Sequence, residues 1–314
     1  MGRQAGNADS SAPTTRELSI HLDTLLGAAL CKNSQATYTR AWELYNEFSR
    51  DCLGISPALP IATPNWALFL AYMFHLKLAP STMRTYISAL GYIHKIRGLE
   101  DKSNSFQVQK LLHGAKCLNS SVDQRLPITE DILGRMIDSL PVVFSNPSIR
   151  LLYETMFLVA FHGFFWIGEL TVRSSDEEAA LQVQDVSLSS SAAYLNISMY
   201  KHNSGKASKI VTLDKLDSTL CPVAALKRYL RQRSLFPGPL FCDRCFKPVA
   251  RSSFNEALRV VFNFLRLDST RYKGHSFRIG AACSAAKKGW SDAKIRQRGR
   301  WNSDAFKAYI PVQL

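Results

Sequence analysis

Apolar side chains recur at three- and four-residue spacing through the first third of the chain. This spacing places side chains on one face of an α-helix and predicts four helices between residues 34 and 118. Ser34 and Ser81 are expected to cap the first and third, Thr63 followed by Pro64 starts the second, and the fourth covers 107–118. The apolar positions of the first three helices are Tyr38, Ala41, Trp42, Tyr45, Phe48, Trp66, Phe69, Leu70, Met73, Phe74, Met83, Tyr86, Ile87, Leu90 and Ile93. They predict a helical bundle.

The pattern changes after residue 118. The polar stretch NSSVDQR at 119–125 breaks the helical period, and LPITEDILGRMIDSL then starts a new helix behind Thr129. A strongly apolar helix follows near 151–161. The alternating segments AAYLNISMYK and KIVTLD, separated by HNSGKAS, predict a β-hairpin. Helices resume at 222–233, at 253–265 and from residue 274 onward.

These patterns predict a mainly α-helical protein with a small β-hairpin or sheet, organised in two domains. Residues 1–15 are small and polar and are expected to form a disordered tail. The first domain is predicted over 16–118, a linker over 119–126 and the second domain over 127–314.

Composition limits the class of protein. Hydrophobic residues make up 46% of the chain and charged residues 20%, which excludes a mainly disordered or collagen-like chain. The longest apolar run, 156–167, contains His162 and is too short to cross a bilayer. No basic start followed by an apolar segment opens the chain. We therefore expect an intracellular protein without a membrane partner.

The cysteines do not form a recognisable framework. Their number is seven, which is odd, and they are scattered over a long chain. Cys242 and Cys245 form a single CxxC, but no two further ligands follow at the spacing of a zinc site. This favours a reduced turn over a metal site.

Charge indicates the partner. The formal net charge is +14, which favours a polyanion as ligand. From residue 265 to the end, eleven Lys and Arg face three Asp and Glu. A solvated helix face would also explain such an excess, but its position beside candidate reactive groups favours nucleic acid.

The same C-terminal stretch carries candidate chemistry. His275 and Arg278, three residues apart, lie on one helix face and can reach a common ligand. A guanidinium fork suits phosphate oxygens, and a histidine can donate a hydrogen bond or move a proton. Tyr309 could act as a nucleophile, although a free phenol has a pKa of about 10 and needs nearby cations or a base. Taken singly, a capped helix start and a core tyrosine are the more common interpretations.

Together these residues form a recognisable series. The arrangement HSFR, GRW and a final Tyr resembles the second conserved box of the tyrosine recombinases, the family of phage integrases and of eukaryotic DIRS-type and Crypton-type mobile elements, to which it is most similar. FHGFFWIGEL resembles the first box, and MYKHNSGKASKIVTL resembles the hairpin that delivers a catalytic lysine. SQATYTRAWELYNEFS and APSTMRTYISALGYIHK resemble the helical core-binding domain. The resemblance covers nearly the whole chain.

This resemblance implies a SAM-like helical core-binding domain followed by an α+β catalytic domain that cuts and rejoins double-stranded DNA. It implies a 3′-phosphotyrosyl intermediate, no metal or small-molecule cofactor, a homo-oligomer on DNA, and a nuclear location. The implied site contains Tyr309 as nucleophile, His275 and Arg278 at the scissile phosphate, and Lys201 as general acid. Trp301 fills the last position by residue type. Arg300 fits it by spacing and is kept as a basic neighbour in reach of phosphate.

The first box departs from the family pattern. An arginine normally stands three residues before the glutamate of GEL, which is Glu169 here, and that position is Trp166. An indole has one uncharged N–H and cannot replace a guanidinium. Losing such a donor costs roughly two to five decades in rate, so we expect weak or absent catalysis. A CGG codon becomes TGG by one transition, which suggests a decayed mobile-element copy.

Three functions therefore stay open. The first is a recombinase or integrase, active or decayed. The second is a catalytically inactive DNA-binding or regulatory protein derived from a mobile element. The third is a basic helical interaction protein with no role on DNA.

Overall fold

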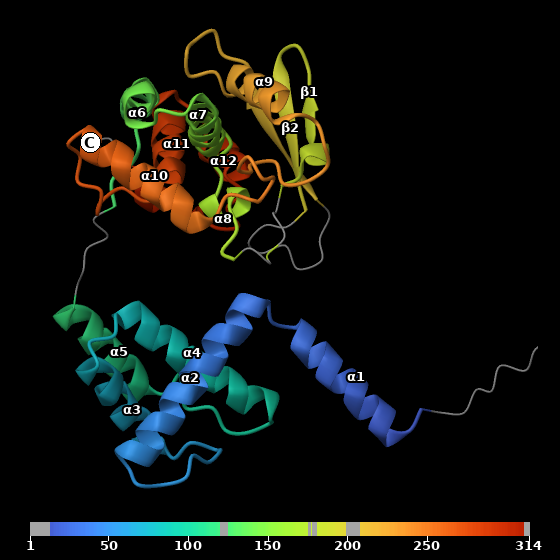
Figure 1. Ribbon diagram of the computed structural model, residues 1–314. Coiled ribbons are helices and arrows are strands. Elements are labelled where there is room, and N and C mark those ends of the chain that lie inside the picture. Colours follow the sequence, from blue (N-terminus) through green and yellow to red (C-terminus); the bar gives the residue numbers. More distant parts are fainter. Residues whose placement is uncertain (1–12, 120–124, 175–176, 178–180, 199–207, 311–314) are drawn as a thin grey trace, which may run out of the picture. The chain divides into compact units, whose positions relative to one another are not determined.

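The protein consists of two compact units, Met1–Val122 and Asp123–Leu314 (Figure 1). The computed structural model describes residues 13–119, 125–174, 177, 181–198 and 208–310. The division falls within the linker predicted over 119–126. Each unit has a hydrophobic core of its own and is described by itself. The DNA-binding and catalytic roles assigned to the two units stay predictions.

The first unit is helical. It contains α1 (Thr15–Ala28), α2 (Lys32–Asp51), α3 (Thr63–His75), α4 (Pro80–Ile96) and α5 (Phe106–Leu118). Trp66 anchors the core with 1% of its surface exposed, and its indole N–H donates to the carbonyl of Ile61 over 3.3 Å. The Ile61 N–H in turn donates to Nε2 of buried His94 over 2.9 Å. Aromatic packing and this short relay fix the loop before α3.

Two features of this unit differ from the sequence analysis. The sequence analysis missed helix α1, although Leu18, Leu22, Leu25 and Leu26 recur at helical spacing; none of its described residues is buried. The predicted caps Ser34 and Ser81 are wrong. Cys31 is the N-cap residue of α2, and Pro80 occupies the first turn of α4, where its fixed φ favours an earlier start.

The second unit consists of packed helices with a small antiparallel sheet at one side (Figure 1). It contains helices α6 (Glu130–Val143), α7 (Pro147–His162), α8 (Ile167–Leu170), α9 (Pro222–Arg233), α10 (Arg251–Phe264), α11 (His275–Lys287) and α12 (Asp292–Arg298), the 3₁₀ turns η1 (Val183–Asp185) and η2 (Asp304–Tyr309), and strands β1 (Val186–Leu188), β2 (Ala192–Ile197) and β3 (Lys209–Asp214). The strands follow the order β1-β2-β3 and lie next to α9. The mainly helical fold with a small sheet is thus confirmed, and β1 is an addition.

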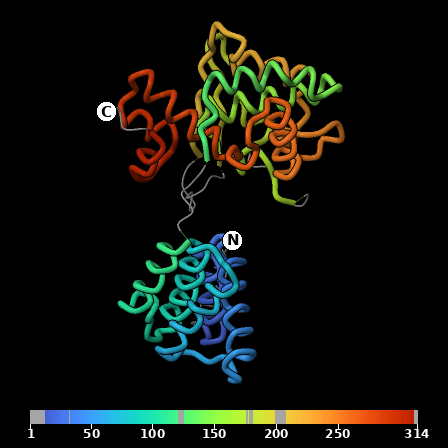
Figure 2. Tube along the Cα trace, turned by 90° about the vertical axis from the view of Figure 1, so that its left-hand side faces the viewer, coloured from blue at the N-terminus to red at the C-terminus, as the bar shows by residue number. Residues whose placement is uncertain are grey.

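Helix α7 is the centre of this unit. It packs against α6, α9 and α11, as Figure 1 shows. The Phe157 ring lies 5.6 Å from those of Phe254 and Phe277, in an edge contact and a stacked contact respectively. Phe277 belongs to α11, so this aromatic cluster fixes the helix that carries His275 and Arg278. The last elements of the chain, red in Figure 2, lie at one side of the unit.

Helix α11 is also approached closely by backbone. The Ile128 N–H donates to the Ser276 carbonyl over 3.0 Å. A Cβ on Gly280 would lie 1.8 Å from the Ile128 carbonyl oxygen. Glycine at 280 therefore permits the segment before α6 to cross α11.

Within the described residues, no helix is both long enough and apolar enough to cross a membrane.

The close approach at Gly280 predicts a sharp contrast between two helical glycines. Gly280→Ala should lower the free energy of unfolding of the second unit by about 1–3 kcal/mol, because the clash is with backbone. Gly134→Ala on α6 is the control, since nothing lies within 4 Å of its Cβ, and it should raise stability by about 0.5–1 kcal/mol. Urea denaturation followed by circular dichroism measures both. Equal effects of the two substitutions would contradict this packing.

Candidate active site

The structure brings together side chains that are distant in sequence at the start of α11. The Nε2 atom of His275, the first residue of α11, lies 3.1 Å from the Tyr309 hydroxyl oxygen at the end of η2. Both side chains are half-buried. The phenol is thus within hydrogen-bond distance of a group that can accept or donate a proton.

Tyr309 is held from its backbone as well. The Cys283 thiol on α11 donates to the Tyr309 carbonyl over 2.9 Å. Phe306, one turn earlier in η2, is fully buried, and its ring lies 5.5 Å from that of Trp301. These contacts fasten η2 to α11. The sequence analysis missed the Cys283 contact, because a lone buried cysteine leaves no local pattern.

Arg278 is buried between two indoles. Only 1% of its surface is exposed, and its Cζ lies 4.0 Å from the Trp301 ring centroid and 4.6 Å from that of Trp166. The guanidinium donates to the carbonyl oxygens of Phe164, over 2.5 Å, and of Gly299. Burial, with the nearby charge of Arg300, lowers the pKa of Arg278 to about 9. It therefore stays charged at neutral pH.

Trp166 fills the position at which the resemblance places the first arginine. Its indole stacks on the His275 ring, with centroids 4.7 Å apart and planes at 21°. Its backbone N–H donates to the Glu169 carboxylate over 2.9 Å, which fixes the start of α8. Trp166 itself is half-buried.

Arg300 and Glu169 form a buried ion pair. Their atoms lie 2.7 Å apart, and the side chains are 6% and 5% exposed. Arg300 also donates to the carbonyl oxygens of Gly163 and Phe164, over 3.1 and 3.3 Å. The guanidinium is therefore engaged inside the protein, and the predicted phosphate contact of Arg300 stays a prediction. The sequence analysis used Glu169 only as a marker of the first box and missed this pair.

The other sequence predictions fall in different places. Trp301 contacts Arg278, as described. Lys201 lies outside the described residues. Cys242 is buried and Cys245 exposed, and in the described part of the chain no cluster of three or more His, Cys, Asp or Glu could hold a metal.

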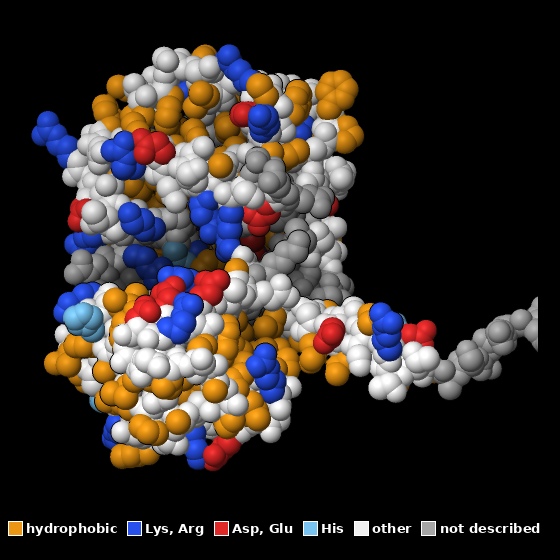
Figure 3. Space-filling view, turned by 60° about the horizontal axis from the view of Figure 1, so that its bottom comes forward, with side chains coloured by type: hydrophobic (Ala, Val, Ile, Leu, Met, Phe, Trp, Pro, Cys, Tyr) orange, Lys and Arg blue, Asp and Glu red, His pale blue; other side chains and the backbone are white. Residues whose placement is uncertain are grey.

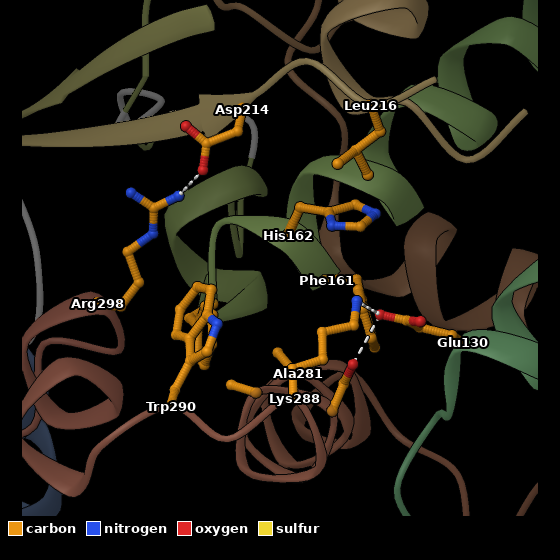
Figure 4. Close-up of a pocket in the computed structure, with 12 residues that line it drawn as sticks. Glu130, Phe161, His162, Asp214, Leu216, Ala281, Lys288, Trp290 and Arg298 are labelled. Carbon is orange, nitrogen blue, oxygen red and sulfur yellow. Dashed lines mark hydrogen bonds and ion pairs between the residues drawn. The ribbon is translucent and has the colours of Figure 1, made fainter. Parts of the chain in front are cut away.

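A cavity of about 110 Å³ lies on another side of α11 (Figure 4). His162, at the end of α7, lies between the ion pairs Asp214–Arg298 and Glu130–Lys288. Burial lowers the pKa of His162 to about 4, against a smaller opposing effect of Glu130. His162 is therefore neutral in the folded protein at neutral pH.

The buried ion pair predicts the cost of removing one partner. Glu169→Ala should lower the free energy of unfolding of the second unit by about 3–5 kcal/mol, because it leaves Arg300 buried without a counter-charge. Glu256→Ala removes one partner of an exposed pair with Arg259 and should cost at most about 1 kcal/mol. Urea denaturation compares the two variants. Similar losses would show that the pair is not buried as described.

The lowered pKa of His162 predicts that the stability of the second unit depends on pH. As pH falls from 6.5 toward 4, the unfolded chain takes up this proton before the folded chain, so stability falls, by up to about 3 kcal/mol. Above pH 6.5 the group has no effect. His162→Gln should flatten the stability curve in this window, as measured by urea denaturation at a series of pH values. Parallel curves for wild type and variant would assign the acid sensitivity to other groups.

Comparisons with known proteins address the fold. No protein-family model and no curated protein matches the chain. Among solved structures, the XerH site-specific recombinase bound to palindromic difH substrate aligns with a TM-score of 0.62 at 17% identity, over 88% of this chain and 75% of that chain. The Tn1549 transposon integrase with circular intermediate DNA aligns with a TM-score of 0.64 at 11% identity, over 93% and 94%.

A third match extends this group. A lambda integrase dimer bound to a COC′ core site aligns with a TM-score of 0.55 at 14% identity, over 93% of this chain and 75% of that chain. Identities this low establish architecture alone. The chain has the fold of the tyrosine recombinases and integrases.

Proposed function

We propose that this protein binds double-stranded DNA as a tyrosine recombinase, with Tyr309 as nucleophile and with catalysis weakened by Trp166. The observation that carries the proposal is the contact of 3.1 Å between His275 Nε2 and the Tyr309 hydroxyl. It lies beside the buried cation Arg278. A phenol, a proton acceptor and a guanidinium at one helix end suit attack on a phosphodiester.

The reaction assigns each group a role. The Tyr309 oxygen forms a bond to phosphorus as its proton passes to His275, and the bond from phosphorus to the 5′-oxygen breaks. Lys201 protonates the leaving oxygen as general acid. Arg278 stabilises the charge that gathers on the non-bridging oxygens. The 3′-phosphotyrosyl product conserves the bond energy for religation, and no metal or other cofactor takes part.

Charge supports DNA as the partner. The first unit carries twelve Lys and Arg against eight Asp and Glu, and the second carries 27 against 17. Figure 3 shows Lys and Arg side chains on the surface of both units. The Tn1549 integrase named above is in complex with circular intermediate DNA, the XerH recombinase is bound to its difH substrate, and the lambda integrase is a dimer bound to a core site. A homo-oligomer on DNA, a DIRS-type or Crypton-type origin and a nuclear location belong to the same proposal.

A second candidate function follows from Trp166. Its indole stacks on His275 at the position of the first arginine. A chain that keeps the DNA-binding surface but lacks this guanidinium would serve as a DNA-binding or regulatory protein derived from a mobile element.

A covalent trapping assay separates the two functions. The full chain first selects the duplexes that it binds from a random pool. A nick is then placed in each duplex so that the cleaved fragment dissociates and the phosphotyrosyl product accumulates. Trp166→Arg should raise the rate of trapping by roughly two to five decades, and Trp166→Lys should rescue less because an ammonium lacks the bidentate fork. Duplex affinity should change little, since one phosphate contact among many is altered.

Tyr309→Phe in the Trp166→Arg background is the control and should abolish trapping. A Trp166→Arg chain that binds duplex but never becomes linked to it would leave the second function. Duplex binding that does not weaken as salt rises would remove both, because phosphate contacts release counterions.

A further inference from the structure

Arg278 is a buried cation that forms no direct ion pair with a carboxylate among the described residues. Its recorded hydrogen bonds go to two backbone carbonyls, and its Nε–H is buried without a partner among the described residues. Glu169 could neutralise this charge, but its carboxylate already accepts hydrogen bonds from the Arg300 guanidinium and from the Trp166 N–H. A buried guanidinium is costly unless paired, and its natural partner is an oxyanion.

The two indoles that cover Arg278 differ in how they are held. Trp301 is part of the core, with its ring 6.1 Å from Phe164 and 5.5 Å from Phe306, and a Cβ on Gly299 would lie 1.7 Å from it. Trp166 is half-buried, as Trp301 is, and its ring contacts His275 and Arg278. Of the two indoles, Trp301 is therefore fastened to the hydrophobic core, and Trp166 is the one that also covers His275.

We infer that the Trp166 indole is a plug that closes a phosphate-binding site formed by His275 and Arg278. The phosphate site then lacks one guanidinium and is also blocked by the indole. This inference rests on the proposed function, because it concerns the same site. Residue 166 then has two separate effects on the site. The guanidinium that Trp166 lacks can be restored only by arginine, whereas the ring that covers the site is removed by substitution with any small side chain.

The plug makes a prediction that needs no DNA. Stacking on His275 and the cation–π contact with Arg278 must be broken before an oxyanion can enter. Trp166→Ala should therefore bind inorganic phosphate at least about tenfold more tightly than wild type. Trp166→Phe keeps a ring over the site and should stay close to wild type.

The matched control is Trp290→Ala. Trp290 also covers a cation, with Lys294 Nζ 4.1 Å from its ring centroid, but it stacks on Phe164 and not on His275. This variant should bind phosphate as wild type does. Near-ultraviolet and far-ultraviolet circular dichroism establish that each variant is folded.

Phosphate is titrated into the full chain at constant ionic strength, and the His275 Cε1–H resonance reports local binding. A tenfold gain in Trp166→Ala alone supports the plug. Equal affinities in wild type and Trp166→Ala, or the same gain in Trp290→Ala, would overturn it.

Duplex binding by the same preparations keeps the two ideas apart. Duplex binding without a gain in phosphate affinity would remove the plug and leave the proposed function. A gain in phosphate affinity in a chain that binds no duplex would do the reverse.

Discussion

The buried pair between Glu169 and Arg300 is the interaction on which the site depends. One Glu169 carboxylate oxygen accepts hydrogen bonds from the Arg300 guanidinium, over 2.7 Å, and from the Trp166 N–H, over 2.9 Å. Arg300 and Arg278 then share the Phe164 carbonyl. The loop between α7 and α8 is in this way bound to the turn that precedes η2. The ion pair therefore fixes the turn that leads into η2, and the contacts of Phe306 and Cys283 hold Tyr309 itself.

Glycine lets the helix that carries the site approach its neighbours. At Gly280 the backbone before α6 crosses α11, and at Gly274 a Cβ would lie 2.4 Å from the Ile167 side chain. The second contact seats α8 directly on the first turn of α11. Trp166, which precedes α8, is consequently placed against His275. Close backbone approach and the ion pair act on the same short loop from two sides.

The sequence predicts what leaves a periodic local pattern. Helices α2 to α5, α9 and the β2–β3 hairpin follow from apolar spacing and turn residues. Helix α1 carries leucines at helical spacing and was overlooked, whereas the three residues of β1 are too few to leave such a pattern. His275 and Tyr309 are 34 residues apart in the sequence, and their proximity was predicted from the family resemblance. Spacing alone cannot predict a contact between residues so far apart. The Glu169–Arg300 pair and the Cys283 contact are tertiary and were missed.

The contacts of Trp166 also explain why an aromatic ring suits the fold at this position. An arginine in this loop would add a third guanidinium near Arg278 and Arg300, and among the described residues Glu169 is the one carboxylate that pairs with either of them. An indole adds no charge, stacks on His275 and offers its π face to Arg278. It thereby adds no further repulsion to the two buried guanidinium groups. Stability therefore favours an aromatic ring at residue 166, whereas the reaction proposed above would favour a guanidinium.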